Sequence, residues 1–309
     1  MAKLIFRKLF FTLLSLLTIF FITFTLMKFI PGDPLQQEEF LPADVYQALR
    51  SHYGFDDPFI VQFYTYVKKL LVLDFGPSLV YQGRSVHDII AAGFPTSLIL
   101  GAEAMILGVP LGILLGIIAA LKQNFWQDKC ILILAVLAVS LPSFIIATLL
   151  QYTLGIQLQL LPIARWGTFA QSIMPAISLA ALPMAFIARL TRTKMIAEMA
   201  QPYVVTARAK GFSEAKIIWT HVLRNILVPV ICYLGPLISF VMTGSFVIEK
   251  IFSVPGLGYW YITSVLNRDY PLNNASPAYL SFGKLITKEG VEHKIFQFGI
   301  LVKSLFDVI

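Results

Sequence analysis

The feature of this sequence that most constrains its fold is a series of five long apolar segments that are almost free of charge. They cover about residues 9–30, 95–121, 130–155, 172–193 and 225–248. A helix needs about 20 apolar residues to cross the roughly 30 Å of hydrocarbon in a bilayer. Because lipid offers no partners to backbone polar groups, apolar segments of this length predict transmembrane helices. The predicted fold class is all-α, a polytopic membrane helix bundle with five spans.

The composition supports a membrane protein over a soluble one. Of the 309 residues, 57% are hydrophobic and 13% are charged, whereas about a quarter of the residues in a soluble domain carry charge. The apolar segments contain prolines, which membrane helices tolerate because neighbouring helices can pair the freed carbonyls. These prolines are Pro110, Pro142, Pro175, Pro183 and Pro236. Cys130 and Cys232 also lie in apolar runs, so we expect two small buried hydrophobic residues, not a disulfide or a metal pair.

The basic residues predict the orientation. Lys3, Arg7 and Lys8 precede the first apolar run, which is too long for a typical signal peptide and has no small-x-small cleavage pattern. We therefore expect a retained anchor with a cytoplasmic N-terminus. Lysines and arginines also gather at residues 122–129 and 189–224, which this orientation places inside, as the positive-inside rule requires. The net charge of +7 then reflects topology, and it gives no reason to expect a nucleic-acid partner.

Residues 31–94 then form an external segment. The stretch IPGDP at residues 30–34 predicts a turn after the first span, because glycine permits a positive φ and proline cannot continue a helix. Residues 42–54 and 58–76 predict two short helices, since each begins with proline and ends near glycine. Two alternatives stay open for them: a cap over the external mouth of a pore, or a solvated insertion.

A second polar segment, residues 194–224, lies on the predicted inner side. The stretch PYVVTARAKG predicts a short helix that Gly211 ends at the C′ position. The stretch SEAKIIWTHVLRN predicts another helix with Ser213 as its N-cap and Glu214 in its first turn. Small residues would let another protein approach the backbone closely, and basic residues would attract an acidic partner or lipid headgroups. The small residues are Thr206, Ala207, Ala209 and Gly211, and the basic residues are Arg208, Lys210 and Lys216. Charge and periodicity alone favour an ordinary basic inner loop, in which the glycine only ends a helix.

Four stretches resemble the B-type permease subunits of oligopeptide and dipeptide ABC importers. They are FIPGDP, YGFDDPFIVQFYTYVKKLLVLDFGPSLVYQGRSVHDII, YVVTARAKGFSEAKIIWTHVLRNILVP and SFVIEKIFSVPGLGYWYITSVLNRDYPL. The third is similar to the EAA loop of that family, whose general form is Glu-Ala-Ala, three residues and Gly. Val205, Thr206, Ala207 and Gly211 stand at those positions, so the first two family residues are replaced. The resemblance covers residues 1–272 in order.

The resemblance implies a fold, a set of partners and a mechanism. It implies a type I ABC importer permease over residues 1–272, in the bacterial inner membrane, with peptide as the cargo, although relatives with similar chains move nickel, glutathione or sugars. It also implies that the inner loop seats on cytoplasmic ATP-binding subunits, beside a second related permease and an extracytoplasmic peptide-binding protein. The implied coupling residues are Thr206, Ala207, Arg208, Ala209, Lys210, Gly211, Phe212 and Ser213. Because the chain has no G-x-x-x-x-G-K-[ST] motif, we expect no enzymatic activity and no cofactor of its own.

Other candidate sites are weaker. Glu103 is the acidic residue well inside a predicted span, where it lines a pathway or has a structural role. One carboxylate without a partner at depth gives little support to a proton relay. The histidines show no spacing typical of a metal site, and VPGLG at residues 254–258 predicts a turn. Two rival functions remain: an ion-coupled secondary transporter, which would need repeats with broken helices, and a non-transporting membrane scaffold.

The tail, residues 273–309, departs from the family pattern after Leu272. Its most apolar piece, residues 295–309, would span about 22 Å as a helix at 1.5 Å per residue, which is too short to cross a bilayer. Lys303 and Asp307 also lie within it. We interpret the tail as an atypical replacement of the sixth span that the family has. It forms an interfacial amphipathic helix or stays irregular, and reading all three frames of the locus downstream tests whether a frameshift produced it.

Overall fold

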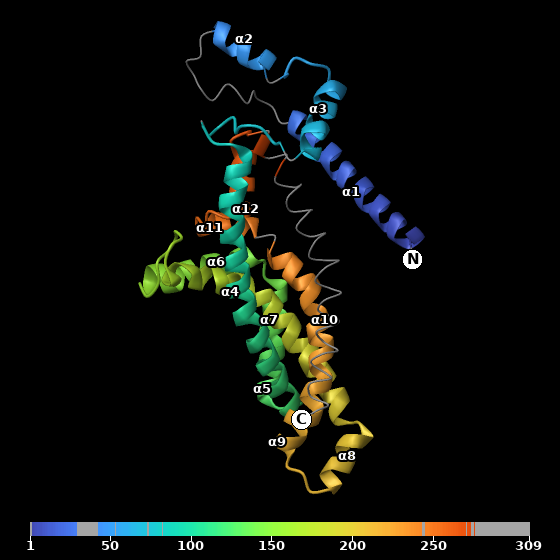
Figure 1. Ribbon diagram of the computed structural model, residues 1–309. Helices are drawn as coiled ribbons and strands as arrows, with labels where there is room; N and C mark the ends of the chain where they lie inside the picture. The colour runs from blue at the N-terminus through green and yellow to red at the C-terminus, as the bar shows by residue number, and fades with distance from the viewer. Residues whose placement is uncertain are drawn as a thin grey trace. The chain divides into compact units, whose positions relative to one another are not determined.

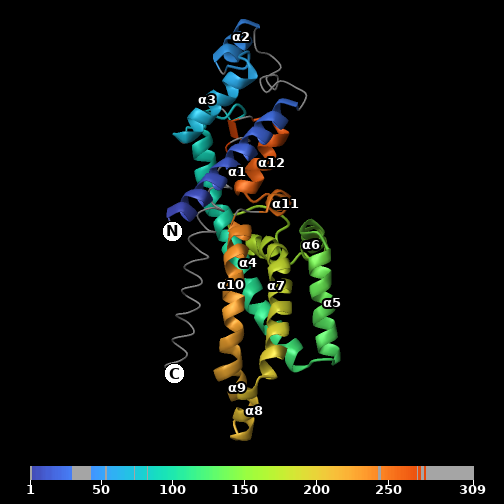
Figure 2. The same cartoon turned by 90° about the vertical axis from the view of Figure 1, so that its right-hand side faces the viewer.

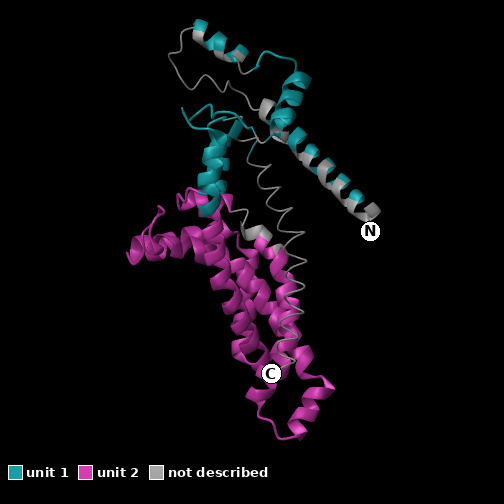
Figure 3. Cartoon of the chain, in the orientation of Figure 1, with its two compact units in different colours: residues 1–95, 256–282 teal, residues 96–255, 283–309 magenta. Residues whose placement is uncertain are grey.

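The computed structural model describes residues 2–29, 43–52, 54–72, 74–81, 83–242, 245–269, 271–272 and 275. The chain divides into two compact units (Figure 3). The first consists of residues 1–95 and 256–282, and the second of residues 96–255 and 283–309. Within the described residues the regular elements are helices, and one isolated bridge pairs Pro77 with Ser85. The all-α prediction is therefore confirmed for this part of the chain.

The first unit is built around aromatic packing between two helices. Its helices are α1 (Ala2–Phe29), α2 (Ala43–His52), α3 (Phe59–Leu71), the beginning of α4 (Val86–Leu121) and α12 (Leu257–Leu266). In α3, Phe59, Phe63 and Tyr66 follow the i, i+4, i+7 spacing of one helix face. They pack against Phe24 of α1, with ring centroids 5.4 to 5.9 Å apart. The two short helices predicted within 42–54 and 58–76 are thus present.

A buried carboxylate ties two distant parts of the first unit together. Asp269, which follows α12, is fully buried and accepts hydrogen bonds from the Ser78 hydroxyl and the Leu79 backbone N–H. The stretch VPGLG forms a turn between α11 (Phe246–Ile251) and α12, as predicted, with Gly256 as the N-cap of α12. The hydrogen bonds of Asp269 with Ser78 and Leu79 join residues about 190 positions apart, so local sequence patterns could not predict them.

The second unit is a helix bundle with α7 at its centre (Figures 1 and 2). It contains the remainder of α4, all of α11 and the elements between these two helices. Those elements are α5 (Trp126–Ser140), α6 (Ser143–Leu150), the π-helical turn η1 (Gln151–Gln157), α7 (Phe169–Met199), α8 (Pro202–Ala209), α9 (Glu214–Ile217), the π-helical turn η2 (Ile218–Val222) and α10 (Leu223–Met242). Helix α7 contacts α5, α6 and α10. Its inward face is made of small and apolar side chains, including Ala176, Ala180 and Ala188, which lets neighbouring helices pack closely.

Three glycines allow α4 to lie directly against α7. Gly108, Gly112 and Gly116 recur every four residues on one face of α4. A Cβ atom added to Gly116 would lie 2.5 Å from the Thr191 Cβ and 2.6 Å from the Ala188 carbonyl oxygen. At Gly112 it would lie 2.8 Å from the Met184 carbonyl oxygen. Only glycine fits at this crossing, a requirement that the sequence analysis did not identify.

The third predicted span, residues 130–155, is not one straight helix. It is split into α5 and a second piece, Ser143–Gln157, which are bent by 106° relative to each other. Leu141 and Pro142 between them have extended ψ angles of 126° and 139°. Proline disfavours the helical conformation of the preceding residue, and its ring clashes with the preceding turn. The expectation that a membrane helix simply accommodates Pro142 is therefore wrong.

The number of spans is only partly tested. Within the described part of the chain, three helices are long and apolar enough to cross a membrane, namely Val86–Leu121, Phe169–Met199 and Glu214–Gly235, and the bent pair would make a fourth. Each overlaps one of the predicted segments, although Glu214–Gly235 begins within the predicted inner loop and covers only the first half of the segment 225–248. The remaining segment, residues 9–30, is largely covered by α1. The total of five spans stays a prediction. The predicted tail, residues 273–309, lies outside the described residues except for Ala275.

The predicted burial of the two cysteines is wrong. Cys130 and Cys232 are both exposed on their helices and neither forms a disulfide. An apolar sequence does not distinguish a buried position from a lipid-facing one, because a membrane helix is apolar on both faces. The apolar neighbours of these cysteines therefore gave no information about burial.

Candidate functional site

The candidate site is a short helical hairpin at one end of the second unit (Figures 1 and 2). It follows α7, runs through α8 and a tight turn into α9, and continues through η2 into α10. Pro202 at the first position of α8 has the φ angle that a helix start requires and lacks an N–H that would need a partner. The hairpin is therefore continuous with two of the long apolar helices.

The turn has the hydrogen bonds of a Schellman motif. Gly211 adopts a φ angle of +80°. Its N–H donates to the Arg208 carbonyl at 2.9 Å, and the Phe212 N–H donates to the Ala207 carbonyl at 3.3 Å. The Ser213 hydroxyl then caps α9 by accepting from the Lys216 N–H. The predicted roles of Gly211 as C′ residue and Ser213 as N-cap are confirmed.

An ion pair closes the turn from outside. The Arg208 guanidinium donates to both carboxylate oxygens of Glu214, at 2.6 and 3.2 Å. This hydrogen bonding lowers the pKa of the Glu214 carboxyl below its usual value. Lys216 lies over the Phe212 ring, with its ammonium 4.6 Å from the centroid. Glu214 offsets the charge of Arg208, whereas Lys216 keeps its charge over the aromatic ring. The attraction of an acidic partner or of lipid headgroups by these basic residues stays a prediction.

Apolar side chains hold the hairpin against the helices that carry it. The buried members of this core are Met195, Val204, Ala207, Ile217, Val222 and Ile226. Ala207 is only 6% exposed, so it packs inward and cannot receive a partner. The expectation that Ala207 is one of the small residues open to another protein is therefore wrong. Thr206, Ala209 and Gly211 are exposed, as that expectation requires.

A polar cluster joins α7, α8 and α10 beneath the hairpin. The Tyr203 hydroxyl donates to the Glu198 carboxylate at 2.7 Å, and the Asn225 side-chain amide donates to the same oxygen at 2.7 Å. Burial, together with the neighbouring carboxylate, raises the pKa of Tyr203 to about 12, so the phenol stays a hydrogen-bond donor. The sequence analysis missed this cluster because its members are 5 and 27 residues apart.

A second polar link joins α5 to α7. Arg192 donates to both oxygens of Asp128, at 2.6 and 2.7 Å. Asp128 is only 2% exposed, and one of its oxygens also accepts from the Asn124 backbone N–H at 2.9 Å. Buried bidentate pairs orient their partners strongly. The pair therefore fixes the start of α5 against the last turns of α7.

The exposed surface of the hairpin is apolar as well as charged. Val205, Phe212 and Trp219 are 58%, 38% and 66% exposed. Exposed aromatic and aliphatic side chains are common where proteins bind one another. Because the turn is held by backbone hydrogen bonds and its own core, it can present these side chains without reorganising.

The sequence comparisons identify the family. The profile described as "Binding-protein-dependent transport system inner membrane component" matches residues 112–300, and the profile of the N-terminal part of the membrane component of such systems matches residues 1–101. The chain belongs to this family. The permease is 44% identical to the dipeptide transport system permease protein DppB of Bacillus subtilis over 272 residues, which is 88% of each chain.

Other relatives agree with this assignment. The permease is 40% identical to the oligopeptide transport system permease protein OppB of Salmonella typhimurium, over 88% of this chain and 90% of the relative. A solved structure of the MetNI methionine ABC transporter, in an inward-facing conformation, matches with a TM-score of 0.47 and 17% identity, over 71% of this chain and 96% of that chain. That structural similarity is weak, and the assignment depends on the sequences.

Besides Asp128 and Glu198, two further carboxylates in the described part of the second unit lie outside the hairpin, Glu103 and Glu249. Glu103 of α4 is half-buried, and its Oε2 atom is buried without a hydrogen-bond partner among the described residues. Its role in a pathway stays a prediction. Glu249 of α11 is fully buried and accepts from the Ser97 hydroxyl at 2.9 Å. The sequence analysis did not single out Glu249, because its partner is 152 residues away.

Proposed function

We propose that this chain is a membrane-spanning subunit of an ATP-driven importer that forms part of the translocation path for short peptides. In this proposal an extracytoplasmic binding protein delivers the peptide, and a second related permease completes the path. ATP is hydrolysed in cytoplasmic subunits that contact the α8–α9 hairpin. The N-terminus and the hairpin both lie on the cytoplasmic side, and the five apolar segments cross the membrane.

The observation that carries the class of function is the 44% identity with a dipeptide permease over 88% of both chains. Identity at this level along almost the whole length extends beyond any single motif. It favours an importer subunit over an ion-coupled transporter or a scaffold, because the relatives belong to binding-protein-dependent systems. The choice of peptide as cargo rests on the names of relatives such as DppB and OppB.

The geometry of the hairpin supports its role as the ATPase contact. A segment that transmits motion from an ATPase subunit to membrane helices must be rigid. This hairpin is held by a Schellman turn, an ion pair and a buried core. It is also directly continuous with α10, since α9, η2 and α10 follow one another without a break. A displacement of the hairpin would therefore move α7 and α10 together.

The test compares two threonines that share one local structure. Thr206 in α8 and Thr193 in α7 are both exposed, and each hydroxyl donates to the carbonyl four residues earlier, at 3.0 and 2.9 Å. We expect Thr206→Arg to abolish co-purification of the ATP-binding subunit and ATP-driven uptake of a labelled dipeptide. Thr193→Arg should leave both intact, because it lies outside the hairpin.

Membrane insertion of both variants is measured by extraction of the membrane fraction with detergent and size-exclusion chromatography. Equal amounts of monodisperse protein exclude misfolding as the cause of a loss. The proposal is contradicted if the Thr206 variant retains both the associated ATPase and full uptake.

A further inference from the structure

The first unit contains a cavity that the coupling role does not use. It has a volume of about 290 Å³, near the lower limit of pockets that bind small molecules, roughly 300 Å³. Helix α3 contributes one of its walls through residues at i, i+3, i+4 and i+7. These are Gln62, Thr65, Tyr66 and Lys69. The cavity is therefore built on a helix face and not only on loops.

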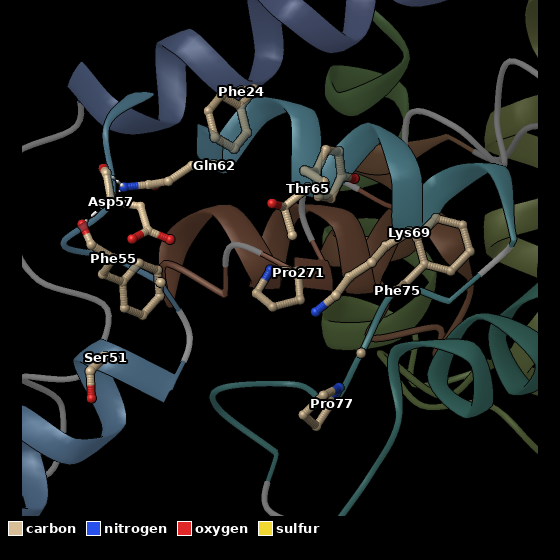
Figure 4. A pocket seen from close by; sticks show the side chains of 13 residues that line it. Phe24, Ser51, Phe55, Asp57, Gln62, Thr65, Lys69, Phe75, Pro77 and Pro271 are labelled. Carbon is tan, nitrogen blue, oxygen red and sulfur yellow. Dashed lines mark hydrogen bonds between the residues drawn. The ribbon is translucent and has the colours of Figure 1, made fainter. Parts of the chain in front are cut away.

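Two opposite charges face each other across this cavity. Figure 4 shows the Lys69 ammonium and the Asp57 carboxylate pointing toward its middle from different sides. Among the described residues, neither side chain has a hydrogen-bond or ion-pair partner. The neighbouring carboxylate of Asp56, by contrast, pairs with Arg50 at 2.8 Å. One of two adjacent acids is thus paired within the chain, whereas Asp57 is exposed at the cavity.

The position of Asp57 is fixed by the helix that carries Lys69. The Gln62 side-chain amide donates to the carbonyl oxygens of Phe55 and Asp57, at 2.9 and 2.7 Å (Figure 4). The turn that presents the carboxylate is thereby attached to α3. Both charged side chains therefore stand on one element, α3 and the turn attached to it, which reduces the reorganisation that binding a ligand would need.

The cavity also has an aromatic wall. The Tyr66 ring contributes to it, while the Tyr66 hydroxyl is buried and out of reach of a ligand in the cavity. Phe24, Phe55 and Phe75 line the cavity, and aromatic rings of this kind accept an apolar side chain.

We propose that this cavity binds a short zwitterionic peptide. The ammonium of the peptide lies beside the Asp57 carboxylate, and its terminal carboxylate lies beside the Lys69 ammonium. An apolar side chain of the peptide packs against the phenylalanines. The choice of a peptide over other zwitterions rests on the proposed function, whereas the requirement for both charged ends rests on the cavity itself.

The test uses the full-length chain, without ATPase subunits, in nanodiscs of phosphatidylcholine and phosphatidylglycerol, so that no amine-bearing lipid competes. The probe is the dipeptide Ala-Phe, and binding is measured by isothermal titration calorimetry. N-acetyl-Ala-Phe lacks the ammonium, and Ala-Phe amide lacks the carboxylate. We expect each blocked peptide to bind at least about tenfold more weakly than Ala-Phe, since hydrogen bonds to charged groups are the strongest in such sites.

Variants assign each end of the peptide to its residue. Lys69→Gln should weaken Ala-Phe about tenfold and leave Ala-Phe amide unchanged, while Asp57→Asn should leave N-acetyl-Ala-Phe unchanged. Lys68→Gln is the matched control, because Lys68 is exposed on the same helix and does not line the cavity.

The proposal is overturned if Ala-Phe does not bind, if the blocked peptides bind as tightly as Ala-Phe, or if the variants at positions 68 and 69 behave alike. None of these outcomes contradicts the proposed function, because that function is tested by ATP-driven uptake in the assembled transporter. A chain that imports peptide but binds no Ala-Phe in nanodiscs would refute the cavity and retain the importer.

Discussion

The α4–α7 crossing and the turn between α8 and α9 both depend on glycine, but for different physical reasons. At the crossing, Gly116 lies inside a helix, and an added Cβ would meet the Thr191 side chain and a backbone carbonyl within 2.6 Å. At the turn, Gly211 has no neighbour within 4 Å of such a Cβ, but its φ angle is +80°. The first glycine is needed for space and the second for conformation.

This difference explains why only one of the two was predictable. A glycine that ends a helix is recognised from the residues beside it. After Gly211, Ser213 and Glu214 indicate that another helix begins. A glycine that makes room is recognised only when the opposing helix is known, and Thr191 is 75 residues further along the chain. The two sites also predict opposite responses to the same substitutions.

The largest effect is expected at the crossing. Gly116→Ala should lower the free energy of unfolding by about 1–3 kcal/mol, the cost of overpacking a tight interior. The effect should be smaller at Gly112 and smaller again at Gly108, because the atom nearest to an added Cβ lies 2.8 Å away at Gly112 and 3.1 Å away at Gly108. Thermal unfolding of each alanine variant in detergent measures this order. Equal unfolding temperatures at all three positions would contradict the close crossing.

A smaller effect is expected at the turn. Gly211→Ala should cost about 1–2 kcal/mol, because a left-handed backbone strains a residue with a Cβ. Gly211→Asn should cost less than alanine, since asparagine tolerates this conformation. At Gly116 the order should reverse, with asparagine worse than alanine. Hydrogen exchange of the hairpin amides measures the destabilisation at Gly211. If alanine and asparagine rank in the same order at Gly211 and at Gly116, the two glycines are not needed for different reasons.

The smallest effect is expected from the ion pair that closes the turn. Arg208 lowers the pKa of Glu214, so the pair stabilises the hairpin above the unfolded pKa of the carboxyl and loses this contribution as the pH falls through the lowered folded value. Arg208→Ala should therefore slightly increase hairpin exchange at pH 7 and make no difference well below pH 4.5, the reference value. Because both side chains are exposed, salt should reduce the difference at pH 7. A difference that persists at low pH would rule out this explanation.

The sequence predicted the parts of the molecule that local rules control. Helix periodicity and apolar length indicated the long helices, and the cap residues indicated the α8–α9 turn down to Gly211 and Ser213. The two short helices in the first unit followed from proline at their starts and glycine at their ends. Each of these features depends on residues within a few positions of one another.

The remaining features depend on contacts between distant segments. The ion pair of Asp128 with Arg192 joins residues 64 positions apart, and Ser97 meets Glu249 across 152 positions. The bend at Leu141 was missed because a proline in a membrane helix is compatible with both a kink and a sharp break. The burial of Ala207 was missed because the hairpin places small residues on both of its faces, and sequence alone does not say which face is covered.

The central claim of this account is that the α8–α9 hairpin lies on the cytoplasmic side, within reach of an ATP-hydrolysing subunit. The most direct test is Lys210→Cys in a chain whose exposed Cys130 and Cys232 have been replaced by serine. A membrane-impermeant maleimide should label this cysteine in inside-out vesicles and leave it unlabelled in intact spheroplasts. Labelling in intact spheroplasts would place the hairpin outside the cell and contradict the proposed coupling.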